Sequence, residues 1–401
     1  MNTFLVKLHK QTVSIEKDVF LSLLDLSPIQ EYKDYLDAVA NNEISFENLK
    51  IFALKAGVPY PLFFAPKAIV DKQLLDKDKN IFEKIPSKNE MRMSSRGKMD
   101  IKDIEVIIKD LSRKQEFLKT RILPQANLNT FIGSVAAKVK GNISIEIIAT
   151  DIRDYLGINL SSLRNISKEK VLQYLCSCAE SKDILISFSS ANFMPQKINK
   201  EVEFSGICIK DKKLPYIFIN TRDDEKKPKI LETTGRQIFT LLTMLVYISM
   251  GEFILSNKPA KSKDDQAKKA FTIAGEILVP KNELVGISIS NLDQLKQKAH
   301  FFRVTPSMLL YQLQANKIIS VGAANAFRQT LSQEIKKAEP IHRHQPLQKN
   351  GYGKYNGERF SREIIRAYQA KAISQVEVKN ILFRKNKMEP TLLQEYIQKY
   401  K

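Results

Sequence analysis

The stretch "FTLLTMLVYISM", residues 239–250, decides the fold of this 401-residue chain. Apolar side chains such as Phe239, Leu242 and Val246 leave no polar stripe along a helix through these residues. A helix that is apolar on nearly every side is buried inside a protein. The stretch therefore predicts a central buried helix, with the neighbouring elements packed around it.

Short strands precede this helix, and further helices follow it. "DILISFSS" (183–190), "EFSGICIK" (203–210) and "LPYIFIN" (214–220) are rich in β-branched and aromatic residues, as strands are. "QAKKAFTIAGEIL" (266–278) has the periodicity of a helix and stops at a proline. We expect an α+β fold, in which a small sheet with a central buried helix is flanked by N- and C-terminal helical domains.

The pattern along the chain divides it into five regions. "DIKDIEVIIKDLSRKQEFLKTRIL" (100–123) is amphipathic, and Ser45 and Gly57 are a plausible N-cap and C-terminal stop for one early helix. The regions are a helix-turn-helix-like region of short helices at 1–65, a linker or arm at 66–100, a helical region at 101–180, the α+β core at 181–335, and a basic helical region at 336–401.

The chain has 64 basic and 44 acidic residues, a net charge of +20. Such an excess indicates an anionic partner, either nucleic acid or an acidic protein surface, although a lysine-rich solvated surface would look the same. Residues 336–401 alone hold 15 basic and 6 acidic residues. The candidate cations for binding phosphates or an acidic partner are Arg362, Arg366, Arg384, Lys385 and Lys387.

Other features argue against several classes of protein. No apolar run is long enough for a membrane span, and the first residues lack the order of a signal peptide, so a cytoplasmic protein is expected. Three cysteines do not make a disulfide framework. Cys176 and Cys178 are two apart on an expected helix, and His342 and His344 flank an arginine. We interpret the first pair as packing and the second as a solvated loop, with a metal site as the alternative for each.

Several motifs, in this order along the chain, resemble one family. They are "YLDAVANNEISFENLKIFALKAGVPYPLFF" (35–64), Arg236-Gln-Ile-Phe-Thr-Leu241, "KAFTIAGEILVP" (269–280) and "AHFFRVTPSMLLYQLQANKIIS" (299–320). Together they resemble the ImmA/IrrE-type metallopeptidase-like family, in its long form with an N-terminal helix-turn-helix-like region. The resemblance implies that residues 181–335 form a zincin-like core.

The family's zinc motif, His-Glu-x-x-His, is degenerate in this chain. The motif places two zinc ligands on one helix face, with a glutamate base beside them. The resemblance puts Thr243, Met244 and Tyr247 in these places. It puts Lys269 in the place of a third ligand, with Asp264 or Asp265 nearby as the alternative. The histidines are His9, His300, His342 and His344, so no such motif exists anywhere in the chain. We expect no catalytic residue, no metal and no cofactor.

The resemblance also suggests what a non-catalytic member would do. Family members often accompany a PIN-type ribonuclease toxin or a repressor. We expect an antitoxin-like regulatory protein that binds an acidic protein such as a PIN-type ribonuclease, because a basic chain suits a carboxylate-rich surface. The alternatives are a DNA-binding transcription regulator, a structural component of a larger complex, and an active zinc peptidase.

Overall fold

A computed structural model of the chain describes residues 3–9, 11–24, 29, 32–74, 104–190, 192–198, 205–221, 234–253, 255–256, 265–337, 346–383 and 390–401. The chain divides into two compact units, which are described separately. Unit 1 comprises Met1–Glu116 and Met194–Glu203, and unit 2 comprises Phe117–Phe193 and Phe204–Lys401. Of the expected linker at 66–100, residues 67–74 are helical and 75–100 lie outside the described residues.

Unit 1 contains a sheet that the sequence analysis did not expect. Strands β1 (Thr3–Leu8) and β2 (Gln11–Glu16) form an antiparallel hairpin, and β3 (Glu43–Ser45) pairs in parallel with β1. The expectation of short helices throughout residues 1–65 is therefore wrong for residues 3–8, 11–16 and 43–45. In β1, Phe4 and Val6 are buried while Thr3, Leu5 and Lys7 are exposed, which is the two-residue period of a strand.

Helices complete unit 1 around one apolar core. Those that contribute to this core are α1 (Lys17–Leu24), α2 (Lys33–Asn41), α3 (Phe46–Ala56) and the 3₁₀ turn η2 (Tyr60–Phe64). Unit 1 also includes α6 (Glu105–Phe117) except for its last residue, which belongs to unit 2. The Ser45 hydroxyl accepts a hydrogen bond from the Asn48 N–H, and Gly57 ends α3 in the left-handed region. Both predicted ends of this helix are therefore confirmed.

Unit 2 begins with the π-helical turn η4 (Leu118–Ile122) and continues with helices on both sides of a sheet. The helices before and between the strands are α7 (Ala136–Lys140), α8 (Ile145–Leu156), α9 (Leu160–Asn165), α10 (Lys168–Glu180) and α11 (Thr234–Ser249). Those that follow are α12 (Asp265–Leu278), the 3₁₀ turn η7 (Lys281–Leu284), α13 (Leu292–Phe301), α14 (Pro306–Ala315), α15 (Val321–Lys337), α16 (Gln348–Asn356), α17 (Glu358–Gln369), α18 (Gln375–Leu382) and α19 (Pro390–Tyr400).

The sheet of unit 2 has the strand order β4-β6-β5-β7. Its strands are β4 (Leu185–Phe188), β5 (Gly206–Ile209), β6 (Tyr216–Ile219) and β7 (Leu255–Ser256). Strands β4 and β6 run parallel, and β5 is antiparallel to both β6 and β7. The three strands expected from the sequence are confirmed.

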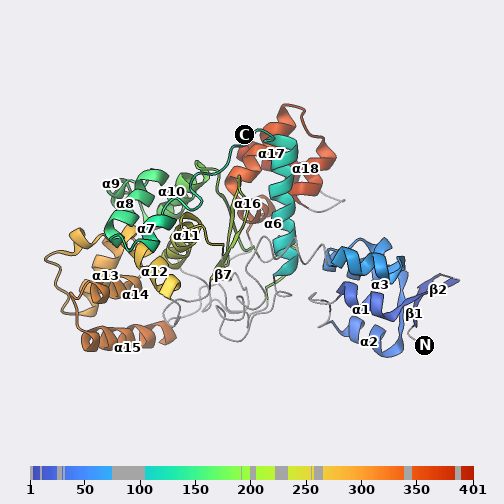
Figure 1. Ribbon diagram of the computed structural model, residues 1–401, viewed down its shortest axis with the longest axis horizontal. Helices are drawn as coiled ribbons and strands as arrows, with labels where there is room; N and C mark the ends of the chain where they lie inside the picture. Colours follow the sequence, from blue (N-terminus) through green and yellow to red (C-terminus); the bar gives the residue numbers. More distant parts are fainter. Residues whose placement is uncertain are drawn as a thin grey trace. The chain divides into compact units, whose positions relative to one another are not determined.

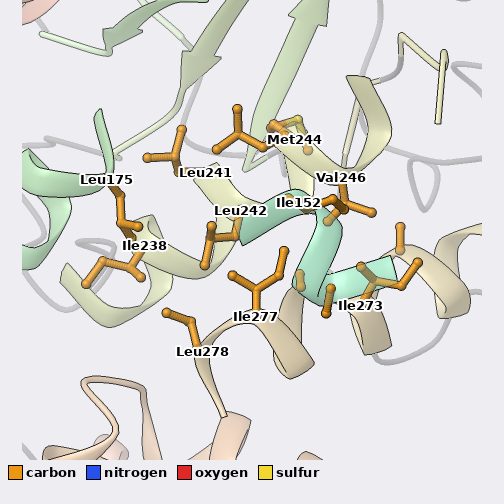
Figure 2. Packing of buried hydrophobic residues seen from close by; sticks show 14 of the residues in the cluster. Ile152, Leu175, Ile238, Leu241, Leu242, Met244, Val246, Ile273, Ile277 and Leu278 are labelled. Carbon is orange, nitrogen blue, oxygen red and sulfur yellow. The ribbon is translucent and has the colours of Figure 1, made fainter. Parts of the chain in front are cut away.

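One face of the sheet is covered by α11, which is buried as the opening stretch predicts. Ile217 and Cys208 of the sheet belong to the same apolar cluster as Leu241 and Met244 of α11. On its other side α11 meets three helices: Leu175 of α10 lies beside Ile238, Ile277 of α12 beside Leu242, and Ile152 of α8 beside Val246 (Figure 2). One helix therefore joins the sheet to the helical part of the core.

The C-terminal helices cover the opposite face of the sheet (Figure 1). Side chains alternate along β6, so that Tyr216 and Phe218 face α16 while Ile217 faces α11. The Tyr216 hydroxyl donates to the Asn356 carbonyl over 3.0 Å, and the Phe218 ring packs edge-on against Tyr355. Unit 2 is thus an α+β arrangement of helices, sheet and helices, with α11 buried at its centre.

Gly357, between α16 and α17, closes the free edge of β4. A Cβ at this position would lie 2.0 Å from the carbonyl oxygen of Ile186, and the residue has φ of +83°. Only glycine allows both this backbone conformation and this approach. An uncovered edge strand offers unpaired backbone groups to other chains, so the α16–α17 junction protects the sheet.

We predict that Gly357→Ala will destabilise unit 2 by about 3 kcal/mol or more, because the backbone strain and the clash with Ile186 add. Chemical denaturation followed by circular dichroism measures this loss. The matched control is Gly322→Ala in α15, where the added Cβ would meet nothing within 4 Å. That change should be neutral, or stabilising by up to about 1 kcal/mol. Equal effects of the two changes would contradict the role given to Gly357.

Candidate functional site

Thr243, Met244 and Tyr247, which the resemblance puts in the places of the zinc motif, lie together on α11 and are buried. Thr243 and Tyr247 are one helical turn apart, and Met244 points toward the sheet beside them. The helix therefore brings these positions together, as the motif would require. The chemistry of each side chain decides what the group can do.

Thr243 is committed to its own helix. Its hydroxyl donates to the Phe239 carbonyl over 2.8 Å, one turn earlier. A threonine inside a helix often satisfies its hydroxyl in this way. The hydroxyl is thus a local backbone partner, and a neutral threonine is a poor zinc ligand.

Met244, in the place of the catalytic base, fills the space between α11 and β5. Its Sδ lies 3.4 Å from the Cys208 Sγ, and the thiol also faces the Met244 carbonyl at 3.6 Å. Gly206 lies beneath, where a Cβ would come within 3.2 Å of Thr240 and 3.7 Å of Met244. The missing side chain of Gly206 leaves room that the flexible methionine occupies.

Lys269, in the place of the third ligand, is exposed on α12. Its ammonium group donates to the Asn142 side-chain oxygen over 3.1 Å. A cation held in this way cannot coordinate a metal ion. Lys269 is therefore an exposed surface residue, in contrast to the buried positions on α11.

Zinc does not fit these residues. A zinc site needs thiolate, imidazole or carboxylate ligands, whereas this set offers a hydroxyl, a thioether, a phenol and an ammonium group. Over the part of the chain that the structure describes, no three or more His, Cys, Asp or Glu side chains gather as a metal site would need. Cys176 and Cys178 are half-buried free thiols on α10. His342 and His344 lie outside the described residues.

The two described arginines of the predicted basic cluster both lie on α17 next to carboxylates. Arg362 Nη2 is 3.9 Å from Glu180 and 4.0 Å from Glu358. Arg366 Nη1 is 3.6 Å from Glu363, and its side chain is 67% exposed. The other three predicted cations, Arg384, Lys385 and Lys387, lie outside the described residues. Of the described pair, Arg366 is the more available to a partner.

Glu180, which the sequence analysis did not single out, is the buried carboxyl at the junction of α10 with α17. It is 5% exposed and accepts the backbone N–H of Arg359 over 3.2 Å. Burial raises the pKa of Glu180 to about 7, and the nearby Glu358 adds to this, while the Arg359 N–H and Arg362 act in the opposite direction. The sequence of α10 does not indicate that this carboxyl is buried, because its partner Arg359 follows about 180 residues later in the chain.

We predict that Glu180→Gln will change how stability depends on pH. The pKa of Glu180 is higher in the folded chain than its ordinary 4.5, so its contribution to stability is full below about pH 4.5 and is lost as pH rises through about 7. Between pH 5 and 8 the wild-type free energy of unfolding should fall relative to the variant by up to about 3 kcal/mol. Denaturant titrations across this range measure the difference.

Glu169→Gln on the same helix is the control. A hydrogen bond with its own backbone lowers the pKa of Glu169, so its contribution is lost only at acidic pH. Parallel pH profiles for wild type and Glu180→Gln would contradict the burial argument.

We also predict that Met244→Ala will cost about 2–5 kcal/mol, because it empties a buried site that Cys208 and Gly206 line. Leu347→Ala, at a position that is 65% exposed, should stay within about 0.5 kcal/mol of wild type. Thermal and denaturant unfolding compare the two. A loss below about 1 kcal/mol for Met244→Ala would mean that water or a ligand replaces the side chain.

Comparison with known proteins adds no relative: no family model, curated protein sequence or solved structure matches this chain. Within the described residues, no helix is both long and apolar enough to cross a bilayer.

Proposed function

We propose that this chain is a non-catalytic ImmA/IrrE-like regulatory protein that binds and restrains an acidic protein, such as a PIN-type ribonuclease toxin. The observation that carries the proposal is the content of the α11 site. Met244 fills the place of the base, and the Thr243 hydroxyl is bonded to its own helix. A group made of these side chains offers neither a general base nor a set of zinc ligands.

The charge of the chain supports binding to an acidic partner. A net charge of +20 speeds encounter with a carboxylate-rich surface and orients the two molecules. The active site of a PIN-type ribonuclease is a cluster of carboxylates, which a basic partner can cover. A binder of this kind needs a stable surface and no reacting group of its own, which agrees with a packed core at α11.

DNA binding is the alternative, and the described arginines of the C-terminal region favour it less. Arg362 and Arg366 both have carboxylates beside them on α17 or α10, which lowers the positive potential that phosphates would meet. Of the five cations predicted to contact phosphates, this leaves Arg384, Lys385 and Lys387. The protein-binding function therefore requires fewer unobserved contacts.

We predict that the chain will form a stoichiometric complex with a small PIN-type ribonuclease encoded beside its gene, and will inhibit it. Size-exclusion chromatography of the mixed proteins and an RNA cleavage assay measure both effects. Elemental analysis of the same preparation should find no stoichiometric zinc. Neutralising the carboxylates of the nuclease active site, as a control, should weaken the complex.

Two results would overturn the proposal. Tightly held zinc at about one ion per chain would restore a metal-dependent function. The other is binding of duplex DNA at low salt when the nuclease is not bound, which would favour the transcription regulator. Changing Arg384, Lys385 and Lys387 together to Ala should then flatten the log–log slope of DNA affinity against salt by up to about three units.

A further inference from the structure

Four lysines lie at one end of the sheet in unit 2. Lys182 precedes β4, Lys210 follows β5, and Lys212 and Lys213 lie in the turn that leads into β6. Because β4 and β6 run parallel and β5 runs antiparallel to β6, the start of β4, the end of β5 and the start of β6 lie at the same end of the sheet. The four residues, called here the lysine edge, are exposed or half-buried.

Asn129 holds the two turns of the lysine edge together. Its backbone N–H donates to the Lys212 carbonyl and its side-chain amide donates to the Lys182 carbonyl, each over 2.8 Å. The ammonium group of Lys182 lies 5.4 Å from the centre of the Tyr155 ring. The lysines are therefore carried by a bonded framework.

The acids of these turns are occupied by other cations. Asp211 accepts hydrogen bonds from Lys119 Nζ (2.6 Å) and from the backbone N–H groups of Lys213 and Leu214. Burial favours a higher pKa for Asp211, but these bonds outweigh it and keep the pKa below its usual range. Asp183 is held by the Arg359 guanidinium.

The lysine edge consequently keeps its positive charge. Among the described residues, none of its four ammonium groups has a carboxylate within ion-pair distance. Lysines without local counterions in a folded surface attract an anionic partner most strongly at low salt. No local sequence pattern marks this group, because its cations come from two separate turns and its acids are paired with residues distant in sequence.

We propose that the lysine edge, together with the exposed Leu128 beside Asn129, is the surface that binds an acidic segment of a partner protein. Leu128 is 67% exposed and offers an apolar contact next to the cations. An acidic peptide with an apolar side chain can meet both, whereas duplex DNA presents only phosphates and sugars along its backbone. All four cations are lysines, which lack the planar fork that arginine offers to phosphates and bases. The inference rests on the proposed function and locates its binding surface.

The test compares two triple variants of the full chain with the same change in charge. The first is Lys210→Gln, Lys212→Gln and Lys213→Gln. The control is Lys140→Gln, Lys170→Gln and Lys298→Gln, at exposed lysines on α7, α10 and α13. The probes are two fluorescent acidic peptides of about 20 residues, with and without leucines, and a DNA duplex of about 20 base pairs. Anisotropy at about 50 and 200 mM salt measures affinity.

The first triple should weaken peptide binding about tenfold, as three rim contacts would, and the control should weaken it by much less. Leu128→Ala should weaken binding of the leucine-containing peptide only. Equal losses for the two triples would overturn the lysine edge but leave acidic binding intact. Tighter binding of DNA, lost in the first triple, would assign the edge to nucleic acid. No peptide binding at low salt would overturn both this inference and the proposed acidic partner.

Discussion

The burial of α11 between the sheet and three helices is the constraint on which unit 2 depends. Ile238, Leu242 and Val246 face α10, α12 and α8 in turn, while Met244 meets β5, so the helix is packed both against other helices and against the sheet. A side chain on such a helix must first satisfy packing, because cavities and unpaired polar groups both cost stability. The packing is satisfied by Thr243, whose hydroxyl bonds to a carbonyl of its own helix, and by the thioether of Met244 and the aromatic ring of Tyr247. Each of these side chains therefore has a packing role in the core that holds the sheet in place.

Much of the positive charge also has an internal use. Arg164 donates to the carbonyls of Leu278 and Phe302, which end α12 and follow α13. Lys168 donates to the Val304 carbonyl, and Arg359 to that of Glu180 at the end of α10. Cations at helix C-termini satisfy carbonyl groups that lack partners in the helix and balance the helix dipole. The net charge of the chain therefore overstates the charge that its surface offers to a partner, because part of it is used inside the fold.

The sequence predicted those features that depend on local patterns. The all-apolar run at 239–250 predicted α11, the β-branched stretches predicted β4, β5 and β6, and Ser45 predicted the start of α3. The β1–β2 hairpin was not predicted, although Phe4 and Val6 alternate with exposed residues, because residues 1–65 were expected to form short helices throughout. Contacts between distant residues, such as Glu180 with Arg359 and Tyr216 with Asn356, have no local signature. The covering of the second face of the sheet therefore could not be predicted.

The position of Gly357 in the sequence also determines when the edge of β4 can be covered during synthesis. Ile186, whose carbonyl it covers, leaves the ribosome long before residue 357 does. The edge of β4 and the face bearing Tyr216 and Phe218 must then wait, solvated, while the intervening chain is made. An apolar sheet face with an open edge is a site for misassociation between nascent chains. The last helices thus cover this face and edge late in synthesis, and before they are made the sheet is most exposed to association with other chains.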